Sequence, residues 1–359
     1  MREIDRIHSA LSDASSRGRS VVLVTVMAVE GSVYRGAGAR MIVTADGATI
    51  GAVSGGCLEA DIVARAPEAL ASGRAELVHY DTRASDDVVM GLGMGCQGVI
   101  DLLLEPLAGA ALDQAHAFYG RLAARRDVAT LLTQVRSRVG TPPVGTRLLL
   151  AQDGSVVEGD TGLLTADRDV TRETVRPATP IVICGGGADA IPLARLAKQL
   201  GWHVTVVDHR PGFVERSRFP DADALVHANL VNDPGALVGR VETGSTTMAV
   251  VMAHAAAHDR AYLHAMLDAS AGYIGVLGPR RRTVELLGTR GPGGGLAMPS
   301  SVHSPVGLDL GAETPDEIAL SIVAEISAVA SGREGGMLRQ RSGPIHERPA
   351  QRADAGHVT

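Results

Sequence analysis

The chain of 359 residues is long enough for two domains of ordinary size, and its 45% hydrophobic content is normal for a globular protein. The net charge of −6 argues against general binding to nucleic acid, which needs a basic surface. No apolar run could span a bilayer, and the N-terminal stretch lacks the apolar core of a signal peptide. We therefore expect a cytoplasmic protein that associates with neither nucleic acid nor membrane.

Residues 1–152 mix helical and strand periodicities and are expected to form an α+β domain. Apolar residues recur at helical spacing in 4–16, whereas 21–29 is a near-continuous apolar run rich in β-branched residues. The turn Ala45-Asp46-Gly47-Ala48 indicates a hairpin. Helices are expected at 4–16, 57–70 and 110–124, and strands at 21–29, 40–44, 49–53, 75–80, 99–104, 128–135 and 146–152.

The second half of the chain has a different organisation. Segment 153–179 lacks sustained periodicity and is expected to hold a hairpin and the connection between domains. In 180–331, strand and helix patterns alternate, as a Rossmann-like, doubly wound parallel sheet requires. Its last helix begins with a capping box, Thr314 and Glu317. The tail, 332–359, is rich in polar residues, Gly and Pro and is expected to be disordered.

A glycine-rich turn joins an expected strand to an expected helix in the first domain. Its sequence is Ser54-Gly55-Gly56-Cys57-Leu58-Glu59. Consecutive glycines free backbone amides that can bind an anion at a helix start. The helix dipole also favours the thiolate of a cysteine placed there. The alternative is a tight structural turn with a small buried thiol, because free cysteine is among the most buried residue types.

The cysteines give no sign of a resident metal site. Cys57, Cys96 and Cys184 lie too far apart in the sequence for a disulfide framework, and no C-x-x-C pair indicates structural zinc. Cys184 falls within an expected strand and is expected in the core. We therefore expect reduced thiols and no resident metal.

A dinucleotide-type turn follows the first strand of the second domain. Gly185, Gly187 and Ala190 form a G-x-G-x-x-A pattern between a strand and a helix. Gly185 permits the turn, and Gly187 lets a phosphate approach the backbone. The second strand ends at Asp208, where a carboxylate can accept hydrogen bonds from ribose hydroxyls. NAD(P) is thus a candidate ligand, although fold alone does not fix function.

Further polar residues follow the carboxyl ends of later strands, where open α/β sheets bind ligands. His254 ends one of these strands, and the next leads into Arg280, Arg281 and Arg282 at a helix start. Three arginines suit a phosphate or a carboxylate, but a solvated helix start is an equally good interpretation. His303 either faces the same crevice or has a structural role.

Together, these motifs resemble the XdhC/CoxI family, accessory proteins in the maturation of molybdenum hydroxylases such as xanthine dehydrogenase. The resemblance covers nearly the whole chain. The chain departs from the family pattern at Tyr34, Gln97 and Ala188, where proline, glycine and histidine are common. The matching segments are 31–35, 38–41, 51–59, 91–98, 105–106, 185–190, 208–210, 254, 273–278 and 303–308.

The resemblance implies a protein that transiently binds the molybdenum cofactor (molybdopterin) and delivers it to an apo molybdenum hydroxylase of the xanthine dehydrogenase or CO dehydrogenase type. It also implies, from some relatives, presentation of the cofactor to a cysteine desulfurase for sulfuration. Because thiolates are soft ligands, Cys57 and Cys96 are candidate contacts to the molybdenum cofactor. We hypothesise that the two cysteines share a site near Arg35 and Arg40.

The expected protein is thus a cofactor-insertion chaperone rather than a catalyst, and a homodimer is a reasonable expectation. The alternative is an NAD(P)-dependent oxidoreductase that uses the second domain, with His254 as its best acid or base but no evident catalytic partner. A third hypothesis is an enzyme that acts on the cofactor through Cys57 or Cys96. No catalytic residue is assigned. The expected cofactor-binding residues are Arg35, Arg40, Ser54, Gly55, Gly56, Cys57, Glu59, Cys96, Gly185, Gly187, Asp208, His254 and Arg280.

Overall fold

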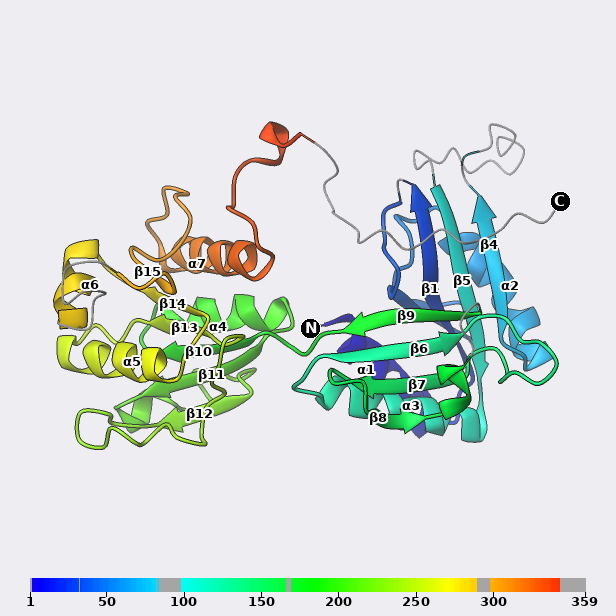
Figure 1. Ribbon diagram of the computed structural model, residues 1–359, viewed down its shortest axis with the longest axis horizontal. Coiled ribbons are helices and arrows are strands. Elements are labelled where there is room, and N and C mark those ends of the chain that lie inside the picture. Colours follow the sequence, from blue (N-terminus) through cyan, green and yellow to red (C-terminus); the bar gives the residue numbers. More distant parts are fainter. Residues whose placement is uncertain are drawn as a thin grey trace. The chain divides into compact units, whose positions relative to one another are not determined.

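The computed structural model describes residues 2–31, 33–81, 83, 98–165, 169–288 and 298–342. The chain divides into two compact units, Met1–Ala178 and Thr179–Thr359 (Figure 1). Among the residues described, no helix is long and apolar enough to cross a membrane.

The first unit has the expected α+β architecture. A five-stranded sheet has the order β3-β2-β1-β5-β4, and a four-stranded sheet has the order β8-β7-β6-β9. The strand pairs in both sheets are antiparallel. The elements are α1 (Glu3–Ser16), β1 (Val21–Gly31), β2 (Arg40–Thr44), β3 (Thr49–Gly51), α2 (Glu59–Ser72), β4 (Glu76–Asp81), β5 (Gly98–Leu107), α3 (Gly109–Ala124), β6 (Ala129–Gln134), β7 (Arg147–Ala151), β8 (Val156–Gly159), η2 (Thr161–Leu164) and β9 (Val170–Val175).

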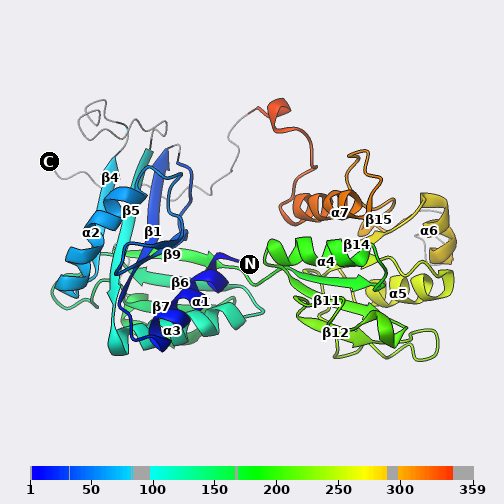
Figure 2. The same ribbon diagram turned by 180° about the vertical axis from the view of Figure 1, so that it is seen from behind.

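Alternate residues of β1 face two separate cores of the first unit. Val22 and Val24 pack with residues of α2, whereas Val21 and Leu23 pack with residues of α1, α3 and the four-stranded sheet. This alternation follows from the two-residue period of a strand. The central strand is therefore apolar on both sides, as its continuous hydrophobic sequence predicted. Figure 2 shows α2 running along the strands of the five-stranded sheet.

The segment 153–179, expected to connect the domains, lies in the first unit as far as Ala178. It supplies β8 and β9, and β9 pairs with β6 along its whole length, from Ala129 opposite Val175 to Gln134 opposite Val170. The strand β8 is mostly exposed, so it lacks the apolar alternation by which a strand is recognised in a sequence. The expected hairpin does not form within the segment, because β8 pairs with the preceding β7 and β9 pairs with β6.

The second unit is a Rossmann-like, doubly wound domain, which confirms the predicted fold class. Its sheet has the order β12-β11-β10-β13-β14-β15, and its pairings are parallel. The strand order reverses between β10 and β13, the usual place for a ligand in this fold. The elements are β10 (Pro180–Cys184), α4 (Ala190–Gln199), β11 (His203–Asp208), η3 (Pro211–Phe213), β12 (Ala224–His227), β13 (Met248–Val251), α5 (Ala256–Asp268), β14 (Tyr273–Val276), α6 (Arg280–Leu287), β15 (Val302–His303), α7 (Pro315–Ala330) and η6 (Leu338–Gln340).

Helices cover both faces of this sheet. Ile181 and Ile183 of β10 pack toward α4 and α7, whereas Val182 and Cys184 pack toward α5 and α6. Figure 1 shows α4 and α7 together on one face and α5 on the other. Trp202, the only tryptophan of the chain, lies in the core under α4 and α7 and is 9% exposed. Its fluorescence therefore reports on the folding of the second unit.

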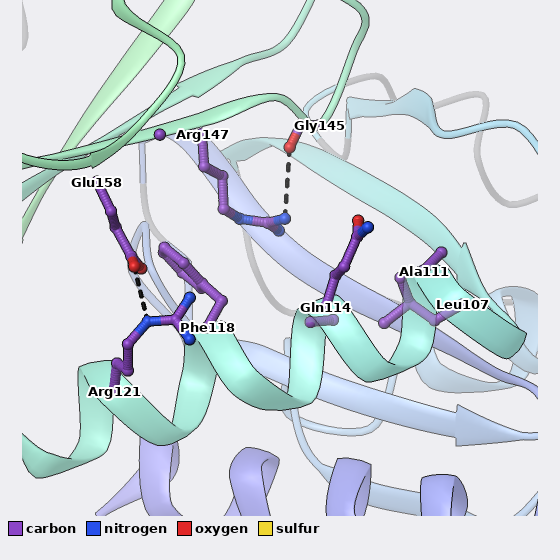
Figure 3. A pocket seen from close by; sticks show the side chains of 10 residues that line it. Leu107, Ala111, Gln114, Phe118, Arg121, Gly145, Arg147 and Glu158 are labelled. Carbon is purple, nitrogen blue, oxygen red and sulfur yellow. Dashed lines mark hydrogen bonds and ion pairs between the residues drawn. The ribbon is translucent and has the colours of Figure 1, made fainter.

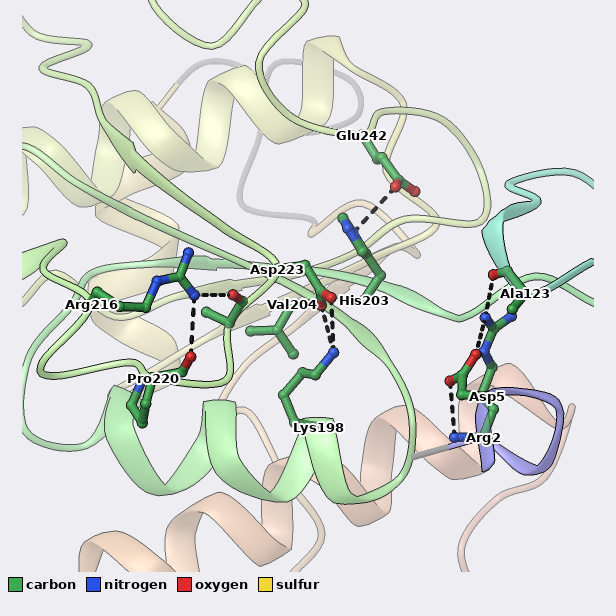
Figure 4. Close-up of polar contacts among 11 residues, drawn as sticks. Arg2, Asp5, Ala123, Lys198, His203, Val204, Arg216, Pro220, Asp223 and Glu242 are labelled. Atoms are coloured by element: carbon green, nitrogen blue, oxygen red, sulfur yellow. Dashed lines mark hydrogen bonds and ion pairs between the residues drawn. The ribbon is translucent and has the colours of Figure 1, made fainter. Parts of the chain in front are cut away.

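Charged side chains fasten element ends within each unit (Figure 4). In the second unit, the Asp223 carboxylate accepts hydrogen bonds from the Lys198 ammonium at 2.8 Å and from the Val204 amide at 2.7 Å. Burial alone would raise the pKa of Asp223, but these hydrogen bonds lower it below the ordinary range. In the first unit, Arg2 pairs with Asp5 at 2.7 Å and so holds the start of α1.

The last helix ends the described core. The predicted capping box at α7 is present, because Thr314 accepts from the Glu317 amide and Glu317 from the Thr314 amide. Residues 332–342 are largely exposed and include η6. The rest of the tail expected to be disordered, 343–359, lies outside the described residues.

Candidate functional site

The glycine-rich turn of the first unit carries its own anion. Glu59 Oε1 accepts hydrogen bonds from the amides of Ser54 at 2.8 Å and Val53 at 3.3 Å. Ser54 Oγ donates to Glu59 and accepts from the amides of Gly56 and Leu58, each at 3.1 Å. The carboxylate thus binds the two amides that precede the glycines, and the Ser54 hydroxyl binds the Gly56 amide within them. Ser54 and Glu59 bind each other and fix the turn.

The helix also begins later than expected. The first residue of α2 is Glu59 and Leu58 is its N-cap, so Cys57 precedes the helix instead of opening it. The helix ends at Ser72, before Gly73 in the left-handed conformation, and Pro67 lies within it. A cysteine outside the first turn gains less from the helix dipole, whose effect falls off within that turn.

We predict that Glu59→Gln weakens the first unit in a pH-dependent way. Burial alone would raise the pKa of Glu59, but hydrogen bonds from Ser54 and Val53 lower it. The carboxylate therefore contributes its full stability at neutral pH and loses it as the pH falls through the folded-state pKa. Urea denaturation at pH 7 should show a loss of about 1 kcal/mol that shrinks toward pH 4.

The control for this prediction is Glu68→Gln on the exposed side of the same helix. It removes the same charge without breaking the turn, so its effect should be within about 0.5 kcal/mol. A loss of unfolding free energy in Glu59→Gln that stays the same at every pH would contradict the proposed role of the carboxylate.

Cys57 stands on this braced turn and is partly exposed. Its side chain packs at the edge of the core beneath α2. Beside it, Gly56 has φ of +109°, and no atom lies within 4 Å of the place a Cβ would occupy. Gly55 lies under the ring of Tyr34, whose Cγ is 3.5 Å from the Cβ position of that glycine. The turn therefore presents a thiol, an open backbone face and an aromatic ring that is 70% exposed.

Neither arginine of the hypothesised common site is a free cation. Arg35 pairs with Glu3 of α1. Arg40 is 2% exposed, and its guanidinium bonds to Glu173, to the Tyr119 hydroxyl and to a backbone carbonyl. Arg40 thus holds β2 to β9, and its guanidinium is bonded within the protein. Cys96 and the glycine-rich stretch around it, residues 91–97, lie outside the described residues.

A separate pocket of about 390 Å³ opens between α3 and the β7–β8 hairpin (Figure 3). Its charges are paired, since Arg121 bonds to Glu158 at 2.7 Å and Arg147 to Glu105. Helices α3 and α2 cover opposite faces of the five-stranded sheet, so the pocket is distinct from the turn. No sequence motif marks it. It is lined by Leu107, Ala111, Gln114, Ala115, Phe118, Arg121, Gly145, Arg147, Glu158 and Gly159.

The dinucleotide-type turn of the second unit uses its glycines differently from the expectation. A Cβ on Gly185 would lie 2.5 Å from the carbonyl carbon of Met252, and one on Gly186 would lie 2.2 Å from the carbonyl oxygen of Phe213. At Gly187 the nearest atom would be His254 Cδ2, at 3.9 Å. Gly185 and Gly186 are therefore required by close packing, whereas the space above Gly187 is open.

His254 lies at the reversal point of the strand order. Its Nε2 is 3.2 Å from Asp189 Oδ2, so the residues after β13 and before α4 meet there. The histidine side chain is 58% exposed, and its backbone has φ of +58°, which is rare outside glycine. Such backbone strain clusters at functional sites. Asp189 was not among the predicted residues. The feature of the sequence that could have indicated it is a carboxylate within the glycine-rich turn 185–190.

Asp208 was expected to bind ribose, but it is fully buried and bonded to the protein. It accepts from the Gly186 amide at 2.7 Å and from the Arg210 amide, Nε and Nη2 at 2.8, 2.9 and 2.9 Å. Burial alone would raise its pKa, yet the Arg210 and Gly186 hydrogen bonds hold the pKa below the ordinary value. Arg210 is therefore the partner of the carboxylate that was expected to bind ribose.

The three arginines of α6 do not form one site. Arg282 pairs with the buried Asp259 of α5, and Arg281 pairs with Glu285 on the surface. Arg280 is exposed, and no side-chain bond from it to another described residue is present. His303 bonds to Glu325 at 3.1 Å and packs on Tyr273, which fits its structural interpretation. Nowhere in the described part do three or more His, Cys, Asp or Glu residues gather as a metal site would require.

The sequence matches two family models. Residues 14–81 match the XdhC and CoxI family, and residues 181–326 match the XdhC Rossmann domain. A Bacillus subtilis protein that is named as a probable subunit of xanthine dehydrogenase is 32% identical over 89% of this chain and 96% of its own length. The chain belongs to the XdhC and CoxI family.

Two further relatives of this XdhC and CoxI protein extend the comparison. The molybdenum cofactor insertion chaperone PaoD of Escherichia coli is 26% identical over 90% of this chain and 87% of its own. The crystal structure of a xanthine dehydrogenase from Bacillus halodurans superposes with a TM-score of 0.77 and 28% identity. That match covers 93% of this chain and 97% of the other. Both halves of the resemblance seen in the sequence are thus confirmed.

Proposed function

We propose that this XdhC and CoxI protein binds the molybdenum cofactor and passes it to an apo molybdenum hydroxylase of the xanthine dehydrogenase or CO dehydrogenase type. The names of its relatives support this role, since one is a molybdenum cofactor insertion chaperone and another is a probable part of xanthine dehydrogenase. The observation that carries the proposal is the thiol of Cys57, partly exposed on a turn that Ser54 and Glu59 hold rigid.

The residues of the turn fit a cargo that contains a soft metal and a planar ring. A thiolate is a soft ligand, as molybdenum in a sulfur-rich environment requires. Gly56 leaves the backbone beside it uncovered, so a bulky group can approach closely. The exposed ring of Tyr34 over Gly55 offers an apolar face to a heterocycle. When bound, the cofactor supplies its own redox chemistry, and the chain needs only to hold and release it.

We expect Cys57→Ala and Cys57→Ser to retain at least about tenfold less cofactor than the unchanged protein. The full chain is incubated with molybdenum cofactor, freed of unbound material by gel filtration, and assayed for pterin by fluorescence after oxidation. The second readout is the activity gained by an apo xanthine dehydrogenase to which the loaded protein is added.

The matched control is Cys184→Ala, the same change at a cysteine buried in β10. It should retain cofactor as the unchanged protein does, with Trp202 fluorescence verifying that the second unit is folded. Cofactor retention and client activation that survive in both Cys57 variants would refute the proposal. Sulfuration with a cysteine desulfurase, the homodimer and the cytoplasmic location stay predictions.

A further inference from the structure

The second unit has the fold of dinucleotide-binding domains, and the carboxylate at the end of its second strand is bonded to the chain itself. In such domains the carboxylate that ends the second strand holds the adenine ribose. That carboxylate is Asp208, which is 0% exposed and already accepts four hydrogen bonds from Gly186 and Arg210. An ionised carboxylate has about four lone-pair positions, so Asp208 has no acceptor left for ribose hydroxyls.

Two arginines and a phenylalanine cover the same place. The Arg210 guanidinium carbon is 3.5 Å from the centre of the Phe213 ring, and that of Arg218 is 4.9 Å from it. Arg218 Nη2 also donates to the Gly186 carbonyl at 2.9 Å. The backbone of Phe213 touches Gly186 so closely that a Cβ on this glycine would overlap its carbonyl oxygen. The turn η3 is therefore packed directly on the glycine loop.

We propose that Arg210, Phe213 and Arg218 act as a built-in occupant that excludes NAD(P) and other adenine dinucleotides from this domain. The inference goes beyond cofactor delivery, because it concerns a different unit and a different class of ligand. A dinucleotide could enter only by breaking the bonds between Arg210 and Asp208. Each charge-assisted hydrogen bond broken without replacement weakens binding by about tenfold or more.

The proposed exclusion affects only one part of the expected dinucleotide site. The residues at Gly187 and His254 remain open, whereas the ribose position is closed. A hydride-transferring enzyme depends on the whole cofactor being fixed in one orientation, and this domain lacks the anchor for half of it. The geometry thus opposes the oxidoreductase alternative for the second unit.

The test uses the full-length protein and three probes: NADH, NADPH and ADP-ribose. NADPH is included because an arginine near this carboxylate is the usual partner of a 2′-phosphate. Isothermal titration should detect no saturable binding of any probe at concentrations up to about 1 mM. One-to-one binding of any of them with a dissociation constant of about 10 μM or tighter would overturn the proposal.

Variants then test the occupant itself. Arg210→Ala frees the Asp208 carboxylate and should bind ADP-ribose at least about tenfold more tightly than the unchanged protein. Arg218→Ala uncovers Phe213 but leaves Asp208 paired, so its gain should be smaller. Arg195→Ala removes an exposed arginine of α4 that pairs with Asp316 and should change nothing.

Trp202 fluorescence shows whether each variant is folded, because Arg210→Ala leaves a buried carboxylate without its partner. A folded Arg210→Ala protein that binds ADP-ribose no more tightly than the unchanged protein would refute the proposed role of Arg210 in excluding dinucleotides. If that variant does not fold, the titrations of the unchanged protein and of Arg218→Ala decide. Cofactor retention through Cys57 is a separate measurement, so the two proposals fail independently.

Discussion

Replacing Gly185 with alanine is expected to destabilise the second unit by about 3–5 kcal/mol, the sum of backbone strain and overlap with packed atoms. Gly185 has φ of +126°, a conformation that side chains disfavour. Its new Cβ would lie 2.5 Å from the carbonyl of Met252 and 2.6 Å from the amide of Ala253. Those atoms follow the end of β13, where the Met252 amide donates to the Cys184 carbonyl at 2.8 Å, so moving them strains that bond. Denaturation followed by Trp202 fluorescence measures the loss.

Gly187→Ala is the matched control for this prediction, two residues along the same turn. Its Cβ would meet only His254 Cδ2, at an ordinary contact distance of 3.9 Å. We expect its free energy of unfolding to change by no more than about 1 kcal/mol. Equal destabilisation by the two changes would show that the turn tolerates no side chain anywhere and that the open space above Gly187 is not real.

The second large effect is expected for Arg40→Met, at about 3 kcal/mol in the first unit. Methionine keeps the apolar stem but removes the guanidinium that bonds to Glu173 and, at 3.2 Å, to the Tyr119 hydroxyl. Breaking a buried ion pair from one side is costly because the partner stays behind without compensation. Hydrogen exchange on peptides from β2 and β9 should show where the protection is lost.

Two further variants qualify the Arg40 prediction. Arg121→Met breaks the pair with Glu158, in which the arginine side chain is 58% exposed, and should have an effect below about 1 kcal/mol. The double change Arg40→Met with Glu173→Leu removes both charges and should recover much of the stability. If Arg40→Met lowers the free energy of unfolding as little as Arg121→Met does, the Arg40–Glu173 pair does not hold the two sheets together.

Local patterns were sufficient to predict most of the fold. The apolar run of β1, the turn between β2 and β3 and the strand–helix alternation after residue 180 all correspond to elements of the structure. The strands β8 and β9 were assigned to a connecting segment because a short, exposed strand has little apolar signal of its own. The place of β9 is set by pairing with β6, a strand many residues away, which a local pattern does not record.

The candidate site was predictable by residue type but not by partner. The sequence placed Cys57 on a glycine-rich turn, and Asp208 and His254 at strand ends, where the structure also has them. It could not show that Glu59 would fold back onto Ser54, or that Arg210 would turn onto Asp208. In both cases a charged residue close in the sequence makes hydrogen bonds to the turn amide or the strand-end carboxylate that such a motif usually leaves for a ligand. Residue spacing alone is compatible with either outcome.

The carboxylate of Glu59 gives the Cys57 turn a property that suits the proposed carrier role. The hydrogen bonds from Ser54 and Val53 to Glu59 come from the chain itself, so the turn needs no cargo to fix its conformation. Loading then requires little ordering of the loop, and unloading leaves no collapsed loop to be rebuilt. Both binding and release therefore avoid the entropic cost of ordering a loop. A client enzyme that binds the same cargo more tightly can withdraw it through a difference in affinity alone, without any energy-driven step in the donor.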